Sequence, residues 1–257
     1  MALRGGVGVL GLAVAGGTLL TVEAFLASRR TYLSAESAPP VEGQFKPSVP
    51  SIGSVKLMLV GDSTAAGVGA TSTRGTVGGH LAESLALRGF SVQLSSVAIS
   101  GSRTTDLGPQ VSRALLAHPD VALILIGAND ATHLTKRAAI EHHLGDAIRR
   151  LEAAGVKVVV GTCPDMGAGD AFLPPLRQLA AWEGRRVGRI ERAEVERTGA
   201  VAVDIGAHTG QEIRRDRDRY LSVDRFHPSD DGYALWSDAL LPEVARAATA
   251  AAHAPVS

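Results

Sequence analysis

Short apolar segments and longer amphipathic segments alternate along most of this chain. Five short segments are mostly apolar and rich in branched residues, a composition typical of strands buried on both faces of a sheet. The predicted strands are 55–60, 91–97, 121–126, 156–160 and 200–203, and the predicted helices are 77–88, 107–117, 138–154, 176–197 and 231–251. This alternation predicts one α/β domain with a five-stranded parallel sheet and helices on both of its faces.

The first thirty residues follow a different pattern. Residues 5–20 carry no charge, with Arg4 before them and Arg29 and Arg30 after them, which predicts a membrane-targeting segment over 1–30. An uncleaved anchor needs about 20 apolar residues and has to tolerate Glu23, whereas a cleaved signal peptide needs a small-x-small site. A buried apolar helix is the third alternative. We expect export to a bacterial cell envelope, membrane-anchored or secreted.

Residues 31–54 contain several prolines among small and polar residues, a composition typical of a linker. We therefore expect the folded domain to span 55–252. The glycines of 6–11 match the dinucleotide-binding fingerprint, but no predicted strand precedes them and they lie inside the apolar segment. We interpret that match as coincidental.

Composition argues against several classes of function. Lys+Arg and Asp+Glu both number 26, so the chain has no basic excess with which to bind a phosphate backbone, and no nucleic-acid partner is expected. A single cysteine, Cys163, excludes an intramolecular disulfide. The eight histidines show no paired-ligand spacing, so neither a metal nor another cofactor is expected.

Gly61-Asp62-Ser63-Thr64 directly follows the first predicted strand. Ligands of parallel sheets bind at the carboxyl ends of the strands, so a serine here would be exposed above the sheet. Alone, the motif is equally typical of a turn or a helix N-cap. It does not fit the G-x-S-x-G elbow of the α/β-hydrolases, because Ala65 occupies the position of the second glycine.

Two further motifs follow the second and third predicted strands. Gly101 could bring a backbone N–H close to a ligand, and Asn129, the only asparagine of the chain, could offer its side-chain amide. Donors of this kind stabilise the oxyanion that develops during acyl transfer. Each residue taken singly could also be an ordinary turn residue.

Asp224 and His227 lie three residues apart just before the last predicted helix. A histidine can remove the proton of a serine hydroxyl while an aspartate orients its imidazole ring. The pair could also be a surface Asp and a His ahead of a capped helix. Four such motifs at successive strand ends favour a catalytic site over coincidence.

Over residues 55–248 the sequence resembles the SGNH (GDSL-type) hydrolase family, through Gly61-Asp62-Ser63, Gly101, Gly127-x-Asn129-Asp130 and Asp224-x-x-His227-Pro228. The resemblance implies a flavodoxin-like three-layer α/β/α sandwich. It implies that Ser63 is the nucleophile, His227 the base and Asp224 its orienting carboxylate. It also implies an oxyanion hole formed by Ser63, Gly101 and Asn129.

The expected function is that of a serine esterase that hydrolyses carboxylic esters through an acyl-serine intermediate. Short-chain acyl esters or lipid acyl chains are the expected substrates. The alternatives are a deacetylase or acyltransferase acting on cell-envelope glycans and, in another class, a non-catalytic flavodoxin-like binding module. The sequence does not choose among these substrates.

Overall fold

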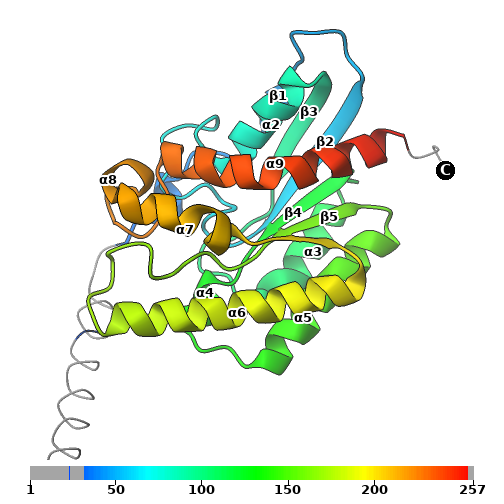
Figure 1. Ribbon diagram of the computed structural model, residues 1–257. Helices are drawn as coiled ribbons and strands as arrows, with labels where there is room; N and C mark the ends of the chain where they lie inside the picture. Colours follow the sequence, from blue (N-terminus) through cyan, green and yellow to red (C-terminus); the bar gives the residue numbers. More distant parts are fainter. Residues whose placement is uncertain (1–22, 24–31, 254–257) are drawn as a thin grey trace, which may run out of the picture.

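The structure, a computed structural model, describes residue 23 and residues 32–253. Its described part contains a six-stranded sheet in the order β1-β3-β2-β4-β5-β6, in which β1 is antiparallel to β3 and the other pairs are parallel (Figure 1). The strands are β1 Gly43–Phe45, β2 Gly53–Gly61, β3 Phe90–Ser96, β4 Val121–Leu125, β5 Lys157–Gly161 and β6 Val201–Val203.

Helices cover both faces of this sheet. They are α2 Val77–Leu87, α3 Leu107–Leu115, α4 Ala128–Thr132, α5 Arg137–Ala153, α6 Leu176–Thr198, α7 Ile205–Arg215, α8 Arg217–Tyr220 and α9 Asp230–Ala252. Alternate side chains of β2 enter opposite cores, because successive strand residues point to opposite faces. Leu57 and Leu59 pack in the core that contains α2 and α9. Met58 and Val60 pack in the core that contains α3 and α5.

The predicted three-layer α/β/α fold is confirmed, with one strand more than expected. The five predicted strands correspond to β2–β6, and the predicted long helices to α2, α3, α5, α6 and α9. Strand β1 was not predicted because its three residues, Gly-Gln-Phe, have no apolar pattern of their own. Its pairing with the edge of β3 defines it as a strand.

The structure shows residues of the expected 31–54 linker in the packed domain. Val41 and Phe45 are buried in the same core as α2 and α9, and Leu33 contacts Asp224. The packed domain therefore begins before residue 55. Apart from Glu23, the expected membrane-targeting segment 1–30 lies outside the described residues. In the described part, no helix is long and apolar enough to cross a membrane.

The order of the strands decides where a site can form. The chain passes from β2 to β3 on one side and then returns past β2 to β4 on the other. In doubly wound sheets, ligands bind at the carboxyl ends of the two strands between which the direction reverses. Here these strands are β2 and β4, which precede Ser63 and Asn129.

Substitution of Phe45 tests whether the segment before residue 55 is part of the packed domain. We expect Phe45→Ala to lower the free energy of unfolding by about 3 kcal/mol, because it removes a buried aromatic side chain. Val49 is 47% exposed in the same segment, so Val49→Ala should change it by less than about 0.5 kcal/mol. Urea denaturation measures both. Equal effects of the two substitutions on the free energy of unfolding would contradict a packed domain that begins before residue 55.

Candidate active site

Ser63, His227 and Asp224 form one continuous hydrogen-bonded chain. The Ser63 Oγ lies 3.0 Å from the His227 Nε2, and the His227 Nδ1 lies 2.6 Å from the Asp224 Oδ2. All three residues are buried. Ser63 comes from the turn after β2, whereas Asp224 and His227 come from the loop before α9. The structure thus brings together the three residues that the sequence predicted would act together.

The carboxylate of Asp224 is held by donors on both oxygens. Its Oδ1 accepts hydrogen bonds from the Ser222 hydroxyl and from the backbone N–H groups of Phe226 and His227. Its Oδ2 accepts from the Leu33 N–H in addition to His227. Burial alone would raise the pKa of Asp224, but these hydrogen bonds outweigh it and hold the pKa well below its usual range. Asp224 therefore remains a carboxylate.

The turn that presents Ser63 depends on Gly61 at the end of β2. Gly61 has a φ of 139°, and a Cβ at this position would lie 1.8 Å from the Leu125 carbonyl oxygen of β4. A side chain is excluded by backbone that cannot move away. The Asp62 Oδ1 then accepts from both the backbone N–H and the hydroxyl of Thr64, which closes the turn around Ser63.

Gly101 and Asn129 line the same cavity as Ser63 and His227. Gly101 has a φ of 84°, in the region that favours glycine. Within the described part of the chain, the N–H groups of Ser63 and Gly101 donate to no protein acceptor. The Asn129 Nδ2 donates one hydrogen bond to the Ser102 carbonyl at 3.1 Å, and an amide nitrogen carries a second hydrogen.

Gln110 is a positioning residue that the sequence reasoning missed. Its Oε1 accepts from the Gly61 N–H at 2.8 Å, and its Nε2 donates to the Gly61 carbonyl and the Ser102 hydroxyl. This one side chain thus ties the Ser63 turn to the Gly101 loop. Gln110 lies on the apolar face of α3 with Leu107, Val111 and Ala114, and is fully buried. A polar residue within an apolar helical stripe was the available signal.

Asp130 connects the third motif to the same loop. Its carboxylate accepts from the backbone N–H of Thr104 at 2.9 Å and from the Thr104 hydroxyl at 2.8 Å. Burial raises the pKa of Asp130, while the Thr104 hydrogen bonds lower it in part. Asp130 therefore contributes to the site by holding the backbone at Thr104 in place.

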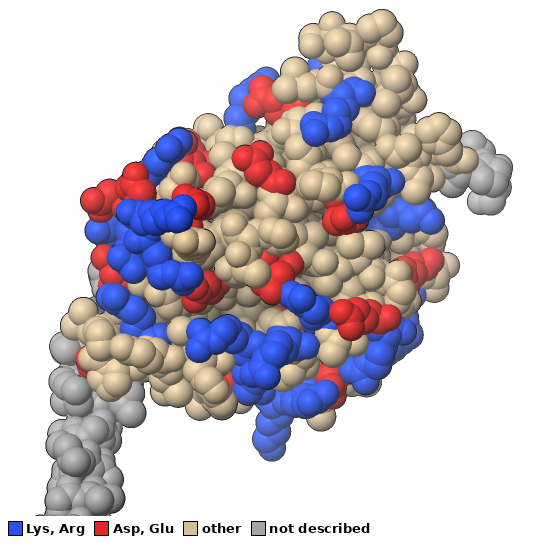
Figure 2. Space-filling view, in the orientation of Figure 1, with Lys and Arg blue, Asp and Glu red and all other residues tan. Residues whose placement is uncertain are grey.

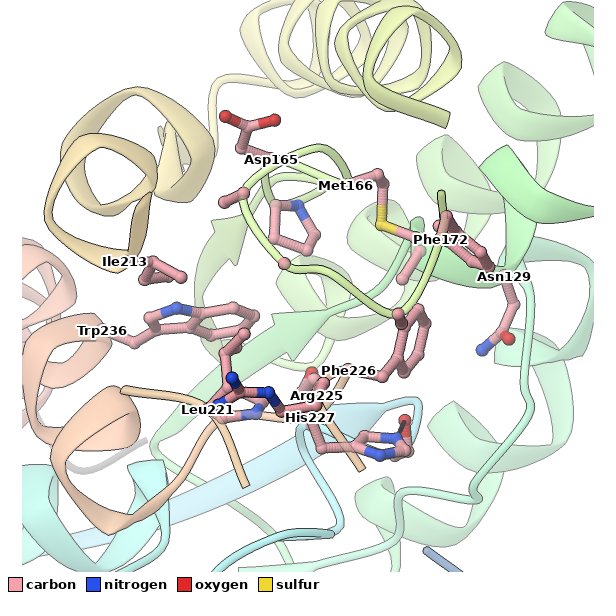
Figure 3. Close-up of a pocket in the computed structure, with 18 residues that line it drawn as sticks. Asn129, Asp165, Met166, Phe172, Ile213, Leu221, Arg225, Phe226, His227 and Trp236 are labelled. Carbon is pink, nitrogen blue, oxygen red and sulfur yellow. Dashed lines mark hydrogen bonds between the residues drawn. The ribbon is translucent and has the colours of Figure 1, made fainter. Parts of the chain in front are cut away.

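Two apolar spaces of very different size adjoin Ser63 and His227. An open groove of about 600 Å³ is lined by Leu33, Leu134, Leu176, Leu179, Phe172 and Phe226, among others. A narrower pocket of about 60 Å³ is lined by residues of the loop that follows β5. Figure 3 shows Trp236 and Ile213 on one side of this pocket and Asn129 and His227 on the other. Both spaces suit apolar groups of a substrate.

Charged residues of both signs are interspersed on the molecular face of Figure 2. Arginines of α6, α7 and α8 pair with neighbouring carboxylates, as in Arg214–Asp165 and Arg219–Asp231. This face has no field of one sign that would attract a polyanion. Within the described residues, no group of three His, Cys, Asp or Glu side chains could hold a metal ion.

The fold and the site define a class: three-layer α/β/α proteins with a Ser–His–Asp triad at the carboxyl edge of a parallel sheet. The GDSL-like Lipase/Acylhydrolase family model matches residues 59–235, and the chain belongs to this family. The chain is 38% identical over 205 residues to a GDSL-like esterase of Mycobacterium tuberculosis. The match covers 79% of this chain and 65% of that relative's length.

Solved structures share the fold at low sequence identity. A lipase/acylhydrolase from Enterococcus faecalis has a TM-score of 0.58 at 20% identity, covering 75% of this chain and 96% of its own. The acetylxylan esterase Axe2 of Geobacillus stearothermophilus has a TM-score of 0.57 at 21% identity, with 76% and 95% covered. Such similarity establishes the common fold and leaves the substrate open.

Asp62 gives the site a pH-dependent stability. Burial raises the pKa of Asp62 from 3.8 to about 6, because it disfavours the charged form. The folded state therefore holds this proton more tightly than the unfolded state, and stability is lost as the pH rises through that interval. Asp62→Asn removes this loss, since an amide oxygen can still accept both hydrogen bonds from Thr64.

We expect the stability of Asp62→Asn relative to wild type to increase by up to about 3 kcal/mol between pH 4 and pH 7. Denaturant titrations across this range measure the difference. Asp238→Asn, on the exposed side of α9, serves as the matched control. A difference that does not change with pH would show that Asp62 titrates normally.

Proposed function

We propose that this protein is a serine esterase that hydrolyses carboxylic esters through an acyl-Ser63 intermediate. The observation that carries the proposal is the hydrogen-bonded chain from Ser63 through His227 to Asp224 at the mouth of an apolar groove. A binding module has no need for a buried carboxylate that aligns an imidazole with a serine hydroxyl. The geometry matches the arrangement that turns an alcohol into a nucleophile.

In the first half-reaction, the His227 Nε2 takes the Ser63 hydroxyl proton as Oγ bonds to the ester carbonyl carbon. The resulting oxyanion accepts hydrogen bonds from the N–H groups of Ser63 and Gly101 and from the Asn129 amide. Collapse of this intermediate breaks the bond to the alkoxy oxygen, which leaves as an alcohol with the proton from His227. Asp224 stays ionised and stabilises the imidazolium.

In the second half-reaction, water replaces the alcohol. His227 removes one proton from the water as its oxygen bonds to the acyl carbon, and the same donors hold the second oxyanion. Collapse releases the carboxylic acid, and His227 returns the proton to Ser63. The cycle uses side chains, backbone N–H groups and water, so no cofactor enters it.

The groove favours esters with an apolar group. Leu134 and Leu179 line it while remaining 60% and 41% exposed, and the ring of Phe172 packs on Phe226 beside His227. Burying an apolar chain against such surfaces stabilises binding by about 0.8 kcal/mol for each CH₂ group. The proposed substrates are therefore small-molecule or lipid esters. Placement in the cell envelope rests on the apolar sequence of 5–22.

Hydrolysis of p-nitrophenyl esters from acetyl to palmitoyl tests the proposal. We expect wild-type turnover and, for Ser63→Ala, a loss of roughly 10⁴-fold or more in kcat, because the nucleophile is removed. Ser112→Ala, an exposed serine of α3, is the matched control and should retain activity. A folded wild-type chain that hydrolyses none of these esters would refute the proposal, as would an active Ser63→Ala.

Asn129→Ala separates oxyanion stabilisation from substrate binding. We expect kcat to fall by about 10²- to 10³-fold with little change in KM, since the amide acts on charge that develops only in the transition state. Steady-state kinetics on the best ester of the panel measure both parameters. A rise in KM at constant kcat would instead assign Asn129 to substrate binding.

A further inference from the structure

Tyr32 and Leu33 contact the loop before α9, which carries two of the triad residues: Leu33 binds Asp224, and Tyr32 packs on Phe226. The Leu33 N–H donates to the Asp224 Oδ2 at 3.1 Å, although the two residues are 191 positions apart in the chain. This is the same oxygen that binds the His227 Nδ1. Leu33 therefore supplies the second of the two hydrogen bonds on the oxygen that orients the imidazole.

Tyr32, the residue before Leu33, packs on the same loop through its aromatic ring. Its ring meets the Phe226 ring edge-on with centroids 5.2 Å apart, and Phe226 in turn meets the His227 ring at 5.1 Å. Aromatic pairs in this edge-on arrangement stabilise each other beyond the effect of their burial. Tyr32 and Leu33 also line the groove that contains Ser63.

We propose that Tyr32–Leu33 is a positioning segment of the active site, in which the Leu33 N–H holds the Asp224 carboxylate in the orientation that His227 requires. This inference rests on the proposed function. Three donors of the loop before α9 hold Oδ1, and among the described residues Leu33 and His227 are the two that bind Oδ2. Rotation of the carboxylate is therefore opposed at Oδ2 by these two residues. The Leu33 donor lies outside residues 59–235, the region that the family model matches.

Because the donor is a backbone N–H, it restricts which residues can occupy position 33 in only one way. Any residue except proline supplies an N–H, so the side chain at 33 is free to vary while proline is excluded. The following segment contains Pro39, Pro40, Pro47 and Pro50, yet position 33 is leucine. The test therefore substitutes proline at position 33 and compares it with a residue that keeps the donor.

Three variants of the full chain separate the donor from the side chain. Leu33→Ala removes most of a side chain that lines the groove but keeps the backbone N–H. We therefore expect it to change substrate binding, and so KM, rather than kcat. Leu33→Pro removes the N–H as well, and we expect its kcat to be roughly tenfold below that of Leu33→Ala. Ser34→Pro places the same ring one residue later, where φ is −85° and suits proline, and should retain wild-type kcat.

A spectroscopic measurement reports on the triad without turnover. The proton between the His227 Nδ1 and the Asp224 Oδ2 lies in a short hydrogen bond of 2.6 Å and should give a resonance far downfield in the ¹H spectrum. We expect Leu33→Pro to shift this resonance relative to Leu33→Ala, whereas Ser34→Pro leaves it in place. If residues 32 and 33 contributed only to folding, this resonance would be the same in Leu33→Pro and Leu33→Ala.

A second pair keeps the proposal testable if Leu33→Pro does not fold. Tyr32→Ala removes the ring that packs on Phe226, and we expect a shifted resonance and a lower kcat, both restored in Tyr32→Phe. The proposal is overturned if a folded Leu33→Pro matches Leu33→Ala in kcat and resonance, or if Tyr32→Ala matches wild type in both. Absence of esterase activity in the wild type would refute the proposed function, while the resonance would still test this segment.

Discussion

The close approach of β2 and β4 at their carboxyl ends is the constraint on which the site depends. Only a glycine fits at position 61, because the Leu125 carbonyl occupies the space of a side chain. The two strands therefore deliver the Ser63 turn and the Asn129 turn to one edge of the sheet. Gln110 binds Gly61 on both backbone groups and reaches Ser102, so the Gly101 loop is held to the same point.

Hydrogen bonding separates the buried carboxyl groups around this edge into two kinds. Burial raises the pKa of Asp62, of Asp130 and of Glu191 on α6, whose carboxylate accepts a hydrogen bond from the Cys163 N–H. Asp224 is also buried, yet five hydrogen bonds hold its pKa low. Negative charge is thus favoured on the one carboxylate that faces the imidazole, and disfavoured on those that hold backbone in place. The identity of the amino acid alone does not make this distinction.

Membership of the GDSL-like family and the structure answer different questions. The family model matches residues 59–235, a range that includes the loops after β2, β3 and β4 on which Ser63, Gly101 and Asn129 lie. Other parts of the groove wall come from the loop after β5, from the start of α6 and from Tyr32 and Leu33. Proteins that share a fold carry out different functions through the residues around their sites, so the fold alone does not define a substrate.

The sequence by itself determined the layered α/β fold, because the pattern of apolar residues within each strand and helix shows which of its faces is buried. It also indicated Ser63, Gly101, Asn129, Asp224 and His227, since each follows a strand or precedes a helix in a short motif. Strand β1, the burial of Phe45, the bridge formed by Gln110 and the donor at Leu33 were decided only by the tertiary structure. Strand β1 and the burial of Phe45 depend on contacts with other elements. Gln110 binds Gly61 49 positions away, and Leu33 binds Asp224 191 positions away. The Leu33 donor is also a backbone N–H, which is the same for nearly every residue in a sequence.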